Sequence, residues 1–347
     1  MMSTHFRALA AAAALAVAGC GAAEDPGVEA CVAPSWQPAI TTLDRSVLCA
    51  WGTSSNDVWM VGGSLGVGDA GSLLLHWDGR AFTEVRTGEE HTLWWIWGTP
   101  DAQAMWMVGE AGTVVRRAGG AVERLPTVVN TTLFGVWGSG PEDVWIVGGD
   151  PGPEGGEKDV LLHWDGRSLA RQPLPERGAT LLKIWGAGPD DIWVGGEGGT
   201  LWHRGPSGWE DRSAEVETFY NLNSVHGCSS DEVYAVGGKV IFRWDGTSWS
   251  HVTEAEDLVS GSVVGVSCGP TSVAVVGAGG LKLRLDKASG RWFDETTEEP
   301  WNTDFHGAWV SNDGDIWSVG GNYGTPASTT DHRIGVVGYR GCAEPRL

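Results

Sequence analysis

The stretch "VWGSGPEDVWIVGG", residues 136–149, holds two tryptophans eight residues apart around an acidic turn, and it ends in a glycine pair. Related copies begin at Ala50 ("AWGTSSNDVWMVGG"), Ile184 ("IWGAGPDDIWVGG"), Val225 ("VHGCSSDEVYAVGG") and Ala308 ("AWVSNDGDIWSVGG"). Counted from the first tryptophan of the motif, seven copies follow one another at intervals of about 40–48 residues, at Trp51, Trp97, Trp137, Trp185, His226, Val266 and Trp309. A repeat of this length indicates an array of similar structural units.

Each unit contains four short runs typical of β-strands. The motif supplies two apolar runs on either side of its turn, and a third run ends in "WDG", as in "LLLHWDGR" at 73–80. An aromatic residue such as Phe82 or Trp249 opens the fourth run, and no helical period is visible after residue 30. Four strands in each of seven units predict an all-β, seven-bladed β-propeller, in which most tryptophans fill the gaps between blades.

The repeats also define the predicted domain organisation. We expect the propeller to span 31–342, with its units near 46–88, 92–129, 132–176, 180–215, 221–254, 262–297 and 305–341. The last unit stops after its third strand, whereas "SWQPAITT", within residues 32–42, looks like an unused fourth strand. The N-terminal strand should therefore complete the last blade, which would remove two open strand edges.

The first residues read as an export signal. A weakly basic start and an apolar run too short to span a bilayer predict a signal peptide over 1–19 and a tether over 20–30. Val17-Ala18-Gly19-Cys20 resembles a bacterial lipobox. The resemblance implies acylation of Cys20 and anchoring in the cell envelope, at the outer membrane. The alternative is ordinary secretion after cleavage behind Ala18.

The remaining cysteines suggest disulfides, which an exported protein can form. Cys31 precedes the spare N-terminal strand and Cys342 follows the last third strand, so a Cys31–Cys342 bridge should tie the ring closed. Cys228 and Cys268 each lie two residues after the position of the first tryptophan in their units, which His226 and Val266 occupy. This shared position makes a bridge between neighbouring inner strands plausible. Cys49 is expected to be a free buried thiol.

The charge and the motifs narrow the possible functions. A net charge of −21 without basic clusters argues against binding to nucleic acid. No HExxH, GxSxG or CxxC motif is present, and His76, His163 and His203 recur at one repeat position on different blades, so they do not converge on a metal. We expect a monomer without a catalytic centre, a resident metal or another cofactor.

Acidic residues recur six positions after the first tryptophan of the motif, or its equivalent, in five units, at Asp57, Asp143, Asp191, Glu232 and Asp315. Two interpretations remain. The carboxylates could form an axial acidic ring that holds a cation near one mouth of the channel, or they could close the turns by accepting backbone hydrogen bonds.

The long loops are the expected site of binding, because function on a rigid scaffold usually lies on loops. Loops at 62–72, 148–159 and 320–333 should share one acidic face with the connections between blades. Trp94, Trp301 and Tyr323 lie outside the repeat pattern and are candidate ligand contacts, with Trp301 the best candidate for an exposed one. Asp150, Glu154 and Asp159 could hold Ca²⁺, although their loop matches no known calcium motif.

The repeated "VWGSGPEDVWIVGG … LLHWDG" pattern resembles kelch-like propeller repeats and exported bacterial propeller lipoproteins over residues 32–342. The resemblance concerns the fold. The anchor, the rigid repeated core, the variable loops and the missing catalytic motifs together predict a membrane-anchored, non-catalytic scaffold that presents its acidic, loop-rich face to a protein or glycan of the envelope. One alternative is a polysaccharide hydrolase or lyase that uses axial carboxylates. Another is a structural factor for envelope assembly. Convergent titratable side chains in the axial pocket would favour the enzyme.

Overall fold

The computed structural model describes residues 33–152, 156–175, 177–298, 301, 303–343 and 345 of the 347 residues. The segment Ala33–Leu347 forms a compact unit. The predicted signal peptide, the tether, the lipidation of Cys20 and the Cys31–Cys342 bridge fall on or involve residues outside the described part, so they stay predictions.

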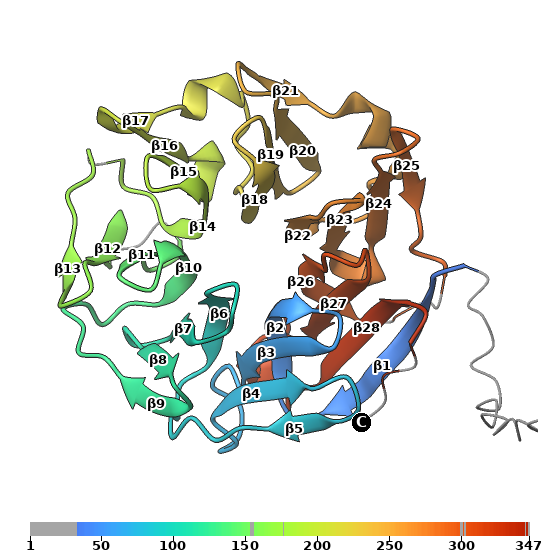
Figure 1. Cartoon of the computed structure of the whole chain (residues 1–347), viewed down its shortest axis with the longest axis horizontal. Helices are drawn as coiled ribbons and strands as arrows, with labels where there is room; N and C mark the ends of the chain where they lie inside the picture. Colours follow the sequence, from blue (N-terminus) through green and yellow to red (C-terminus); the bar gives the residue numbers. More distant parts are fainter. Residues whose placement is uncertain are drawn as a thin grey trace, which may run out of the picture. The chain divides into compact units, whose positions relative to one another are not determined.

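The described residues form seven four-stranded antiparallel sheets arranged around a ring (Figure 1). This confirms the predicted all-β, seven-bladed propeller. The first three blades consist of β2 (Ser46–Ser54), β3 (Asp57–Gly63), β4 (Ser72–Trp77) and β5 (Phe82–Glu84); β6 (Leu93–Gly98), β7 (Ala104–Gly109), β8 (Val114–Ala118) and β9 (Ala121–Arg124); and β10 (Leu133–Gly140), β11 (Asp143–Gly148), β12 (Val160–Trp164) and β13 (Leu169–Arg171).

The next three blades follow the same order, with the innermost strand first. They consist of β14 (Leu181–Gly188), β15 (Asp191–Gly196), β16 (Leu201–Gly205) and β17 (Gly208–Asp211); β18 (Ser224–Ser229), β19 (Glu232–Gly237), β20 (Val240–Trp244) and β21 (Trp249–His251); and β22 (Val263–Cys268), β23 (Ser272–Gly277), β24 (Lys282–Asp286) and β25 (Arg291–Asp294).

The seventh blade is built from both ends of the chain. It contains β26 (Asp304–Val310), β27 (Ile316–Gly321) and β28 (Gly335–Gly341), and its outer edge is β1 (Ser35–Leu43). β1 pairs antiparallel with β28, from Ser35 opposite Gly341 to Leu43 opposite Gly335. The predicted closure by the N-terminal strand is therefore confirmed.

Helical structure in the described part of the chain is limited to short 3-10 turns: η1 (Glu197–Gly199), η2 (Ser213–Glu215), η3 (Thr253–Leu258), η4 (Ala278–Gly280) and η5 (Ala327–Thr329). Among the described residues, no helix combines the length and the apolar character that crossing a membrane requires.

Tryptophans fill the seams between blades, as their repetition predicts. At several seams the indole on the second strand of one blade packs against an indole on an outer strand of the next. Ring centroids lie 5.3 Å apart for Trp106 and Trp164, and 5.1 Å apart for Trp193 and Trp244. Trp317 closes the ring by contacting Trp77 of blade one at 6.1 Å. Large buried rings of this kind contribute much of the apolar contact area in a core.

A second set of contacts joins the innermost strands. The first tryptophan of each motif reaches over the glycine that follows the equivalent tryptophan in the next blade. A Cβ on that glycine would lie 2.5–3.0 Å from the indole Cη2 in the pairs Trp51–Gly98, Trp97–Gly138, Trp137–Gly186, Trp185–Gly227 and Trp309–Gly52. The repeated Trp-Gly dipeptide thus provides both halves of this inter-blade contact, which we call the Trp–Gly lock.

The lock changes at blades five and six. Strand pairing places His226 opposite Tyr234 and Ser267 opposite Ala274, so Ser267, rather than Val266, occupies the tryptophan position of blade six. The sequence alignment of this repeat was wrong by one residue because the turn after β22 is one residue shorter. Cys268 consequently takes the glycine position and is not equivalent to Cys228.

Candidate functional site: the loop face

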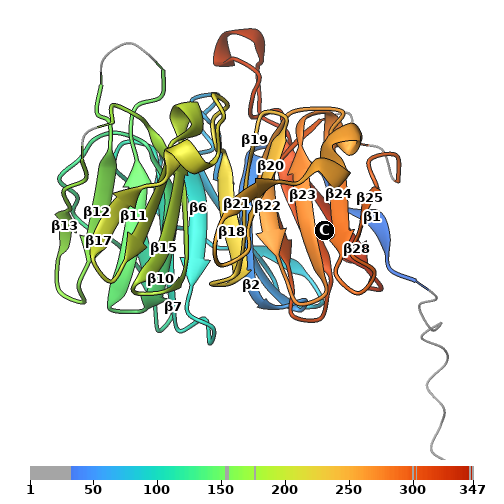
Figure 2. The same ribbon diagram turned by 90° about the horizontal axis from the view of Figure 1, so that it is seen from above.

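The loops that follow β11 and β27 project from the same side of the ring (Figure 2). In a propeller with this strand order, the connections between blades reach the same side. We call this surface the loop face. It comprises the loops 64–71, 149–159 and 322–334 and the connections 85–92, 125–132, 172–180, 212–223, 252–262 and 295–303, as far as these are described.

Arg333 fastens the loop of blade seven to blade one. Its side chain is 3% exposed, and its guanidinium donates hydrogen bonds to the carbonyl oxygens of Asn322 (2.8 Å) and Thr325 (2.6 Å) within its own loop. It also donates to the carbonyls of Ser64 and Leu65 in blade one, each at 3.2 Å. One buried cation therefore positions two of the three long loops.

Lys158 fastens the third long loop to blade four. Its ammonium donates to the carbonyl oxygens of Asp150 and Gly152, to Thr180 Oγ1 at 2.9 Å and to Glu197 Oε2 at 3.0 Å. Burial raises the pKa of Glu197, but hydrogen bonds, first from the Gly152 amide and then from Lys158, outweigh it and leave that pKa below its usual value. The carboxylate thus remains ionised and keeps the loop in place.

Three large hydrophobic side chains are exposed among the described residues, and all three lie on the loop face. Phe219 is 80% exposed, Val128 is 70% exposed and Ile334 is 36% exposed. Phe219 packs only partly, with its ring centroid 4.8 Å from that of Tyr220. These residues belong to the connections before blades three and five and to the loop of blade seven, so each offers a separate apolar contact on the loop face.

Exposed carboxylates also lie on the loop face. The structure places exposed acidic residues on the loop face at Asp69, Glu90, Glu217, Glu254, Glu256, Asp257 and Asp331. Of the cations on the same face, Lys158 and Arg333 are used internally, whereas Arg86 is exposed. The surface therefore offers apolar contacts together with exposed carboxylates, which favours partners carrying positive charge.

The sequence analysis did not single out Phe219 or Val128. Phe219 belongs to the unrepeated "TFYNLN" segment between η2 and β18, and this break in the repeat pattern is the signal that could have found it. Val128 has no comparable signal, because a single valine in a connection does not reveal its exposure.

Trp301, predicted as the best exposed contact, is partly buried instead. Its ring centroid lies 5.5 Å from that of Phe305, and it packs against the core between blades six and seven. The prediction of an exposed side chain is wrong because this connection folds back onto the core, where an indole is more favourably placed than in water.

Trp94 and Tyr323 meet near the axis, in a cluster contributed by blades two, three and seven. The Trp94 ring lies 5.1 Å from Phe134 and 5.5 Å from His306, and His306 lies 5.0 Å from Tyr323. The Tyr323 hydroxyl donates to the Phe305 carbonyl at 3.2 Å. The two predicted contacts therefore lie in one half-buried aromatic cluster, where each packs against His306.

Two basic groups are buried at this cluster: Lys183 beside it, and His306 within it. The Lys183 ammonium donates to the Phe134 carbonyl at 3.1 Å and lies 4.1 Å from the centroid of Trp95, and burial lowers its pKa to about 8. Burial and the nearby Lys183 charge lower the pKa of His306 to about 3, so its neutral ring donates from Nδ1 to the Leu48 carbonyl at 2.6 Å. Both groups lack a carboxylate partner in the contacts of the described residues.

The repeated acidic turns pair with histidines inside their own blades. Asp57 Oδ1 lies 2.7 Å from His76 Nε2, and the His76 ring stacks on Trp59 at 3.9 Å. The same arrangement recurs for Asp143 with His163 and for Asp191 with His203. In the other two blades that carry an acidic turn, blades five and seven, Glu232 and Asp315 accept hydrogen bonds from the hydroxyls of Tyr234 and Tyr339. The sequence analysis missed this pairing, and the proposed cation-binding role of the ring stays a prediction.

The proposed calcium ligands lie in the loop after β11. Asp150 accepts from Thr131 Oγ1 at 2.5 Å and from the Glu157 amide at 2.8 Å, and these bonds lower its pKa. Asp159 instead accepts from the amides of Arg177 and Gly178. Glu154 lies outside the described residues, so the calcium hypothesis stays a prediction.

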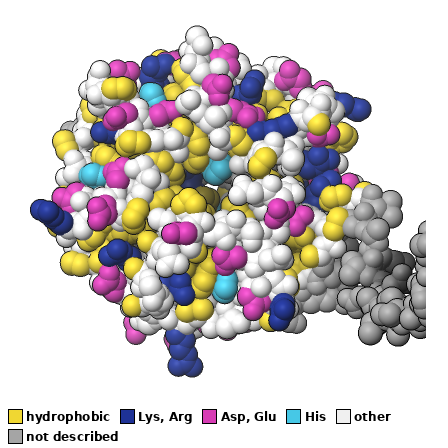
Figure 3. All heavy atoms as spheres, in the orientation of Figure 1, with side chains coloured by type: hydrophobic (Ala, Val, Ile, Leu, Met, Phe, Trp, Pro, Cys, Tyr) yellow, Lys and Arg dark blue, Asp and Glu magenta, His cyan; other side chains and the backbone are white. Residues whose placement is uncertain are grey.

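The axial mouth opposite the loop face is a hollow of about 550 Å³, lined by the indoles of Trp51, Trp97 and Trp137 and by the glycines and short turns that follow them. Hydrophobic side chains gather around the central opening of the ring in Figure 3. Its lining residues carry no carboxylate, histidine, lysine or cysteine. The convergent titratable groups that the polysaccharide-cleaving alternative requires are thus not found among them.

No protein-family model and no curated protein matches the chain. Solved structures share its fold at low sequence identity. YCF48 bound to D1 peptide is 13% identical and has a TM-score of 0.60 over 88% of this chain and 96% of that chain. The WD40 β-propeller domain of Doa1 is 13% identical, with a TM-score of 0.62 over 87% and 96%. The WD40 repeats of RRP9 are 11% identical, with a TM-score of 0.65 over 89% and 98%. Strand topology and structural similarity therefore agree that the chain is a seven-bladed β-propeller.

Proposed function

We propose that this protein is a non-catalytic binding propeller that holds a protein partner on its loop face. One observation carries the proposal: the exposed large hydrophobic side chains of the described residues, Phe219, Val128 and Ile334, all lie on this face. Isolated exposed apolar residues are common on protein surfaces, but their restriction to one acidic face favours a contact surface.

The charge pattern specifies the chemistry of the partner. Apolar contacts on a face with exposed carboxylates complement a segment with apolar side chains flanked by lysine or arginine. The fixed positions of the long loops, fastened by Arg333 and Lys158, reduce the ordering cost of binding. YCF48, a protein of similar fold, has been solved with a bound peptide, and a peptide segment is a suitable occupant here too.

The proposal includes location. We infer from the lipobox-like residues that the chain is a lipoprotein of the bacterial cell envelope and that Cys20 carries its anchor. The repeat pattern itself favours kelch-like repeats. Growth with a labelled fatty acid tests the anchor: the wild-type protein should carry label, and the Cys20→Ala variant should carry none. Label retained by that variant would remove lipidation of Cys20 from the account.

Binding is tested with the full-chain protein, purified in mild detergent and used to capture proteins from solubilised envelope. The test variant is Phe219→Ser/Val128→Ser. The matched control is Arg80→Ser/Arg167→Ser, which changes exposed residues in hairpins at the opposite side of the ring. A partner that the control retains and the test variant loses supports the proposal, and its capture should weaken as salt rises from 0.1 to 0.5 M because screening reduces the charge attraction. Equal capture by both variants would contradict a loop-face site.

A further inference from the structure

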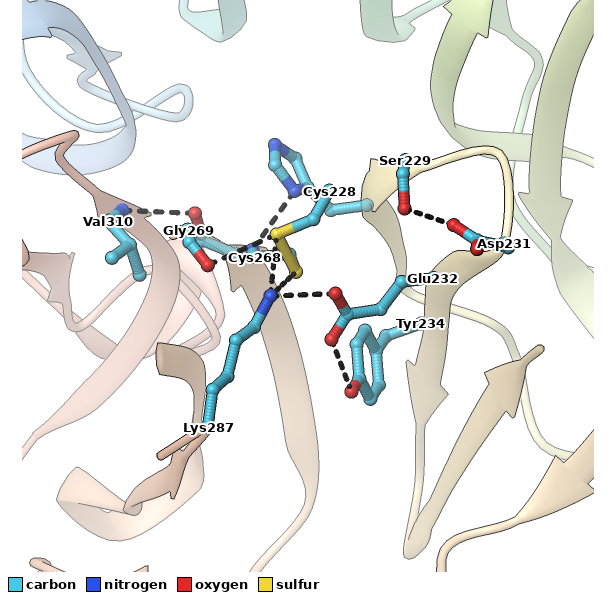
Figure 4. The surroundings of a disulfide bond; sticks show 11 residues. Cys228, Ser229, Asp231, Glu232, Tyr234, Cys268, Gly269, Lys287 and Val310 are labelled. Atoms are coloured by element: carbon cyan, nitrogen blue, oxygen red, sulfur yellow. Dashed lines mark hydrogen bonds and ion pairs between the residues drawn. A yellow bond between two sulfur atoms is a disulfide. The ribbon is translucent and has the colours of Figure 1, made fainter. Parts of the chain in front are cut away.

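The Cys228–Cys268 disulfide joins the innermost strands of blades five and six, which confirms the predicted bridge (Figure 4). The two sulfurs differ in access: Cys228 is exposed, whereas Cys268 is 7% exposed. A thiol arriving from solvent can therefore reach Cys228 more readily than Cys268.

A lysine ammonium lies against both sulfurs. Lys287 Nζ is 3.1 Å from Cys228 Sγ and 3.4 Å from Cys268 Sγ, and Figure 4 shows its side chain extending toward the disulfide. The same ammonium donates to Glu232 Oε2 at 2.8 Å. The backbone amide of Lys287 donates to the Thr271 carbonyl at 3.0 Å, which fixes the residue next to the turn that follows Cys268.

A cation at this place has a chemical consequence. Thiol–disulfide exchange requires a thiolate to attack one sulfur while the other sulfur leaves with the bonding electron pair. A leaving thiolate is stabilised by a nearby ammonium, which lowers the pKa of its thiol and speeds departure. A purely structural disulfide has no need for a hydrogen-bond donor directed at its sulfurs.

A cleft of about 430 Å³ shares Glu232, Tyr234 and Lys287 with the surroundings of the disulfide, and Arg243 and His251 also line it. The cleft lies at the seam between blades five and six, and Trp292 also lines it. Tyr234 replaces the tryptophan of the second strand, and Leu285 replaces the tryptophan of the third. Neither cysteine lines the cleft, but Lys287, which does, contacts both sulfurs, so the cleft offers space for the remainder of a small thiol whose sulfur reacts at Cys228.

We propose that Cys228–Cys268 is a thiol-exchange site, at which a low-molecular-weight thiol becomes linked to Cys228 while Cys268 leaves as a thiolate beside Lys287. The incoming thiolate forms one S–S bond with Cys228 Sγ, and the Cys228–Cys268 bond breaks with its electron pair going to Cys268 Sγ. No net oxidation occurs, because one disulfide replaces another. Attack of Cys268 on the mixed disulfide releases the small thiol again.

The exchange also alters the contact between two blades. Here the Trp–Gly lock is absent, and the non-covalent contact in its place is a hydrogen bond from the Cys268 amide to His226 Nδ1 at 3.0 Å. Opening the disulfide therefore removes the covalent link between blades five and six, at a seam where Tyr234 replaces the second-strand tryptophan. The disulfide lies near the mouth opposite the loop face, although Val252 and Glu254 of the 252–262 connection line part of the cleft. The proposal does not depend on the proposed function.

The test uses full-chain protein and reduced glutathione as the probe thiol, without denaturant. Samples are trapped with an alkylating reagent over time, and peptide mass mapping assigns the state of each cysteine. We expect glutathione on Cys228 and alkylation on Cys268. Replacing the ammonium in Lys287→Met should slow the appearance of the adduct about tenfold, Lys287→Arg should restore most of the rate, and Glu232→Gln should raise it.

Lys239→Met is the matched control, because Lys239 is exposed and lies in the turn between β19 and β20, at the opposite end of β19 from Glu232. It should react at the wild-type rate. Circular dichroism confirms that each variant is folded before its rate is compared. Glutathione on Cys268, a Lys287→Met rate equal to wild type, or a disulfide that opens only in denaturant would each overturn the proposal.

Discussion

The indole of Trp97 in blade two lies against Gly138 of blade three, so a Cβ at residue 138 would stand 2.7 Å from the Trp97 Cη2 atom. Where the tryptophan is missing, so is the glycine. Ser267 stands at the tryptophan position of blade six, and Val310 fills the glycine position of blade seven and donates its amide to Ser267 Oγ at 3.0 Å. The two positions of the lock therefore complement each other in volume across neighbouring blades.

Gly138→Ala should lower the free energy of unfolding by about 1–3 kcal/mol, because the added methyl group overlaps the Trp97 ring and a backbone carbonyl in a packed seam. Gly140→Ala is the control on the same strand, since a Cβ there meets no atom within 4 Å. Urea unfolding at pH 7 compares the two. Similar losses of unfolding free energy in both variants would show that strand propensity, rather than the Trp–Gly lock, determines the change in stability.

The natural replacement in blades six and seven suggests a rescue. Trp97→Ser/Gly138→Val copies the pair formed by Ser267 and Val310, and it should be more stable than Gly138→Val alone despite the loss of a large ring. Urea midpoints measured on the two variants decide the point. A double variant less stable than Gly138→Val would mean that the two residues do not compensate each other.

Stability should fall as the pH decreases from 7 to 5. Burial depresses the pKa of His306 to about 3, whereas in the unfolded chain it titrates near 6.5, so the unfolded state takes up the proton first. The stabilisation is thus complete above about pH 6.5 and is lost as the pH falls toward 3. His306→Asn, which keeps a donor for the Leu48 carbonyl, should lose about 2 kcal/mol less than wild type between pH 7 and 5 in urea titrations. Parallel curves for the two proteins would contradict the buried neutral imidazole.

Lys183→Met should stabilise the protein by about 1–3 kcal/mol at pH 7. Burial lowers the pKa of Lys183 to about 8, and the charged ammonium consequently opposes folding at neutral pH, with one backbone hydrogen bond and one ring contact in return. Wild-type stability should also rise between about pH 8 and 10.5, where the unfolded chain holds the proton and the folded chain does not. A destabilised methionine variant would show that the ammonium contacts outweigh its burial.

Arg333→Met should loosen the loop face without unfolding the ring. The guanidinium contacts carbonyls in the loop of blade seven and in that of blade one. We expect faster amide hydrogen exchange at 322–334 and 64–67, with unchanged exchange in β26 and β27. Uniformly faster exchange through blade seven would instead assign Arg333 to the stability of the whole blade.

The sequence predicts the fold well because the tryptophans and glycines that decide it are repeated, and repetition is visible without structure. The ring closure by β1 follows from counting strands in the last unit. Blade six is misaligned by one residue, since the shortened turn after Cys268 appears only in the pairing of Ser267 with Ala274. The site is harder to predict because exposure depends on how each connection folds: Trp301 turns into the core, whereas Phe219, in a similar connection, remains in solvent.

The central claim is that the partner occupies the loop face. Amide hydrogen exchange of the full-chain protein, alone and with a captured partner, tests it most directly. We predict slower exchange in the complex at 126–131 and 216–223, around Val128 and Phe219, with no change in the turns 53–56, 100–103 and 140–142 at the opposite mouth. Protection confined to those turns, with 216–223 unchanged, would contradict the account and assign binding to the tryptophan-lined hollow.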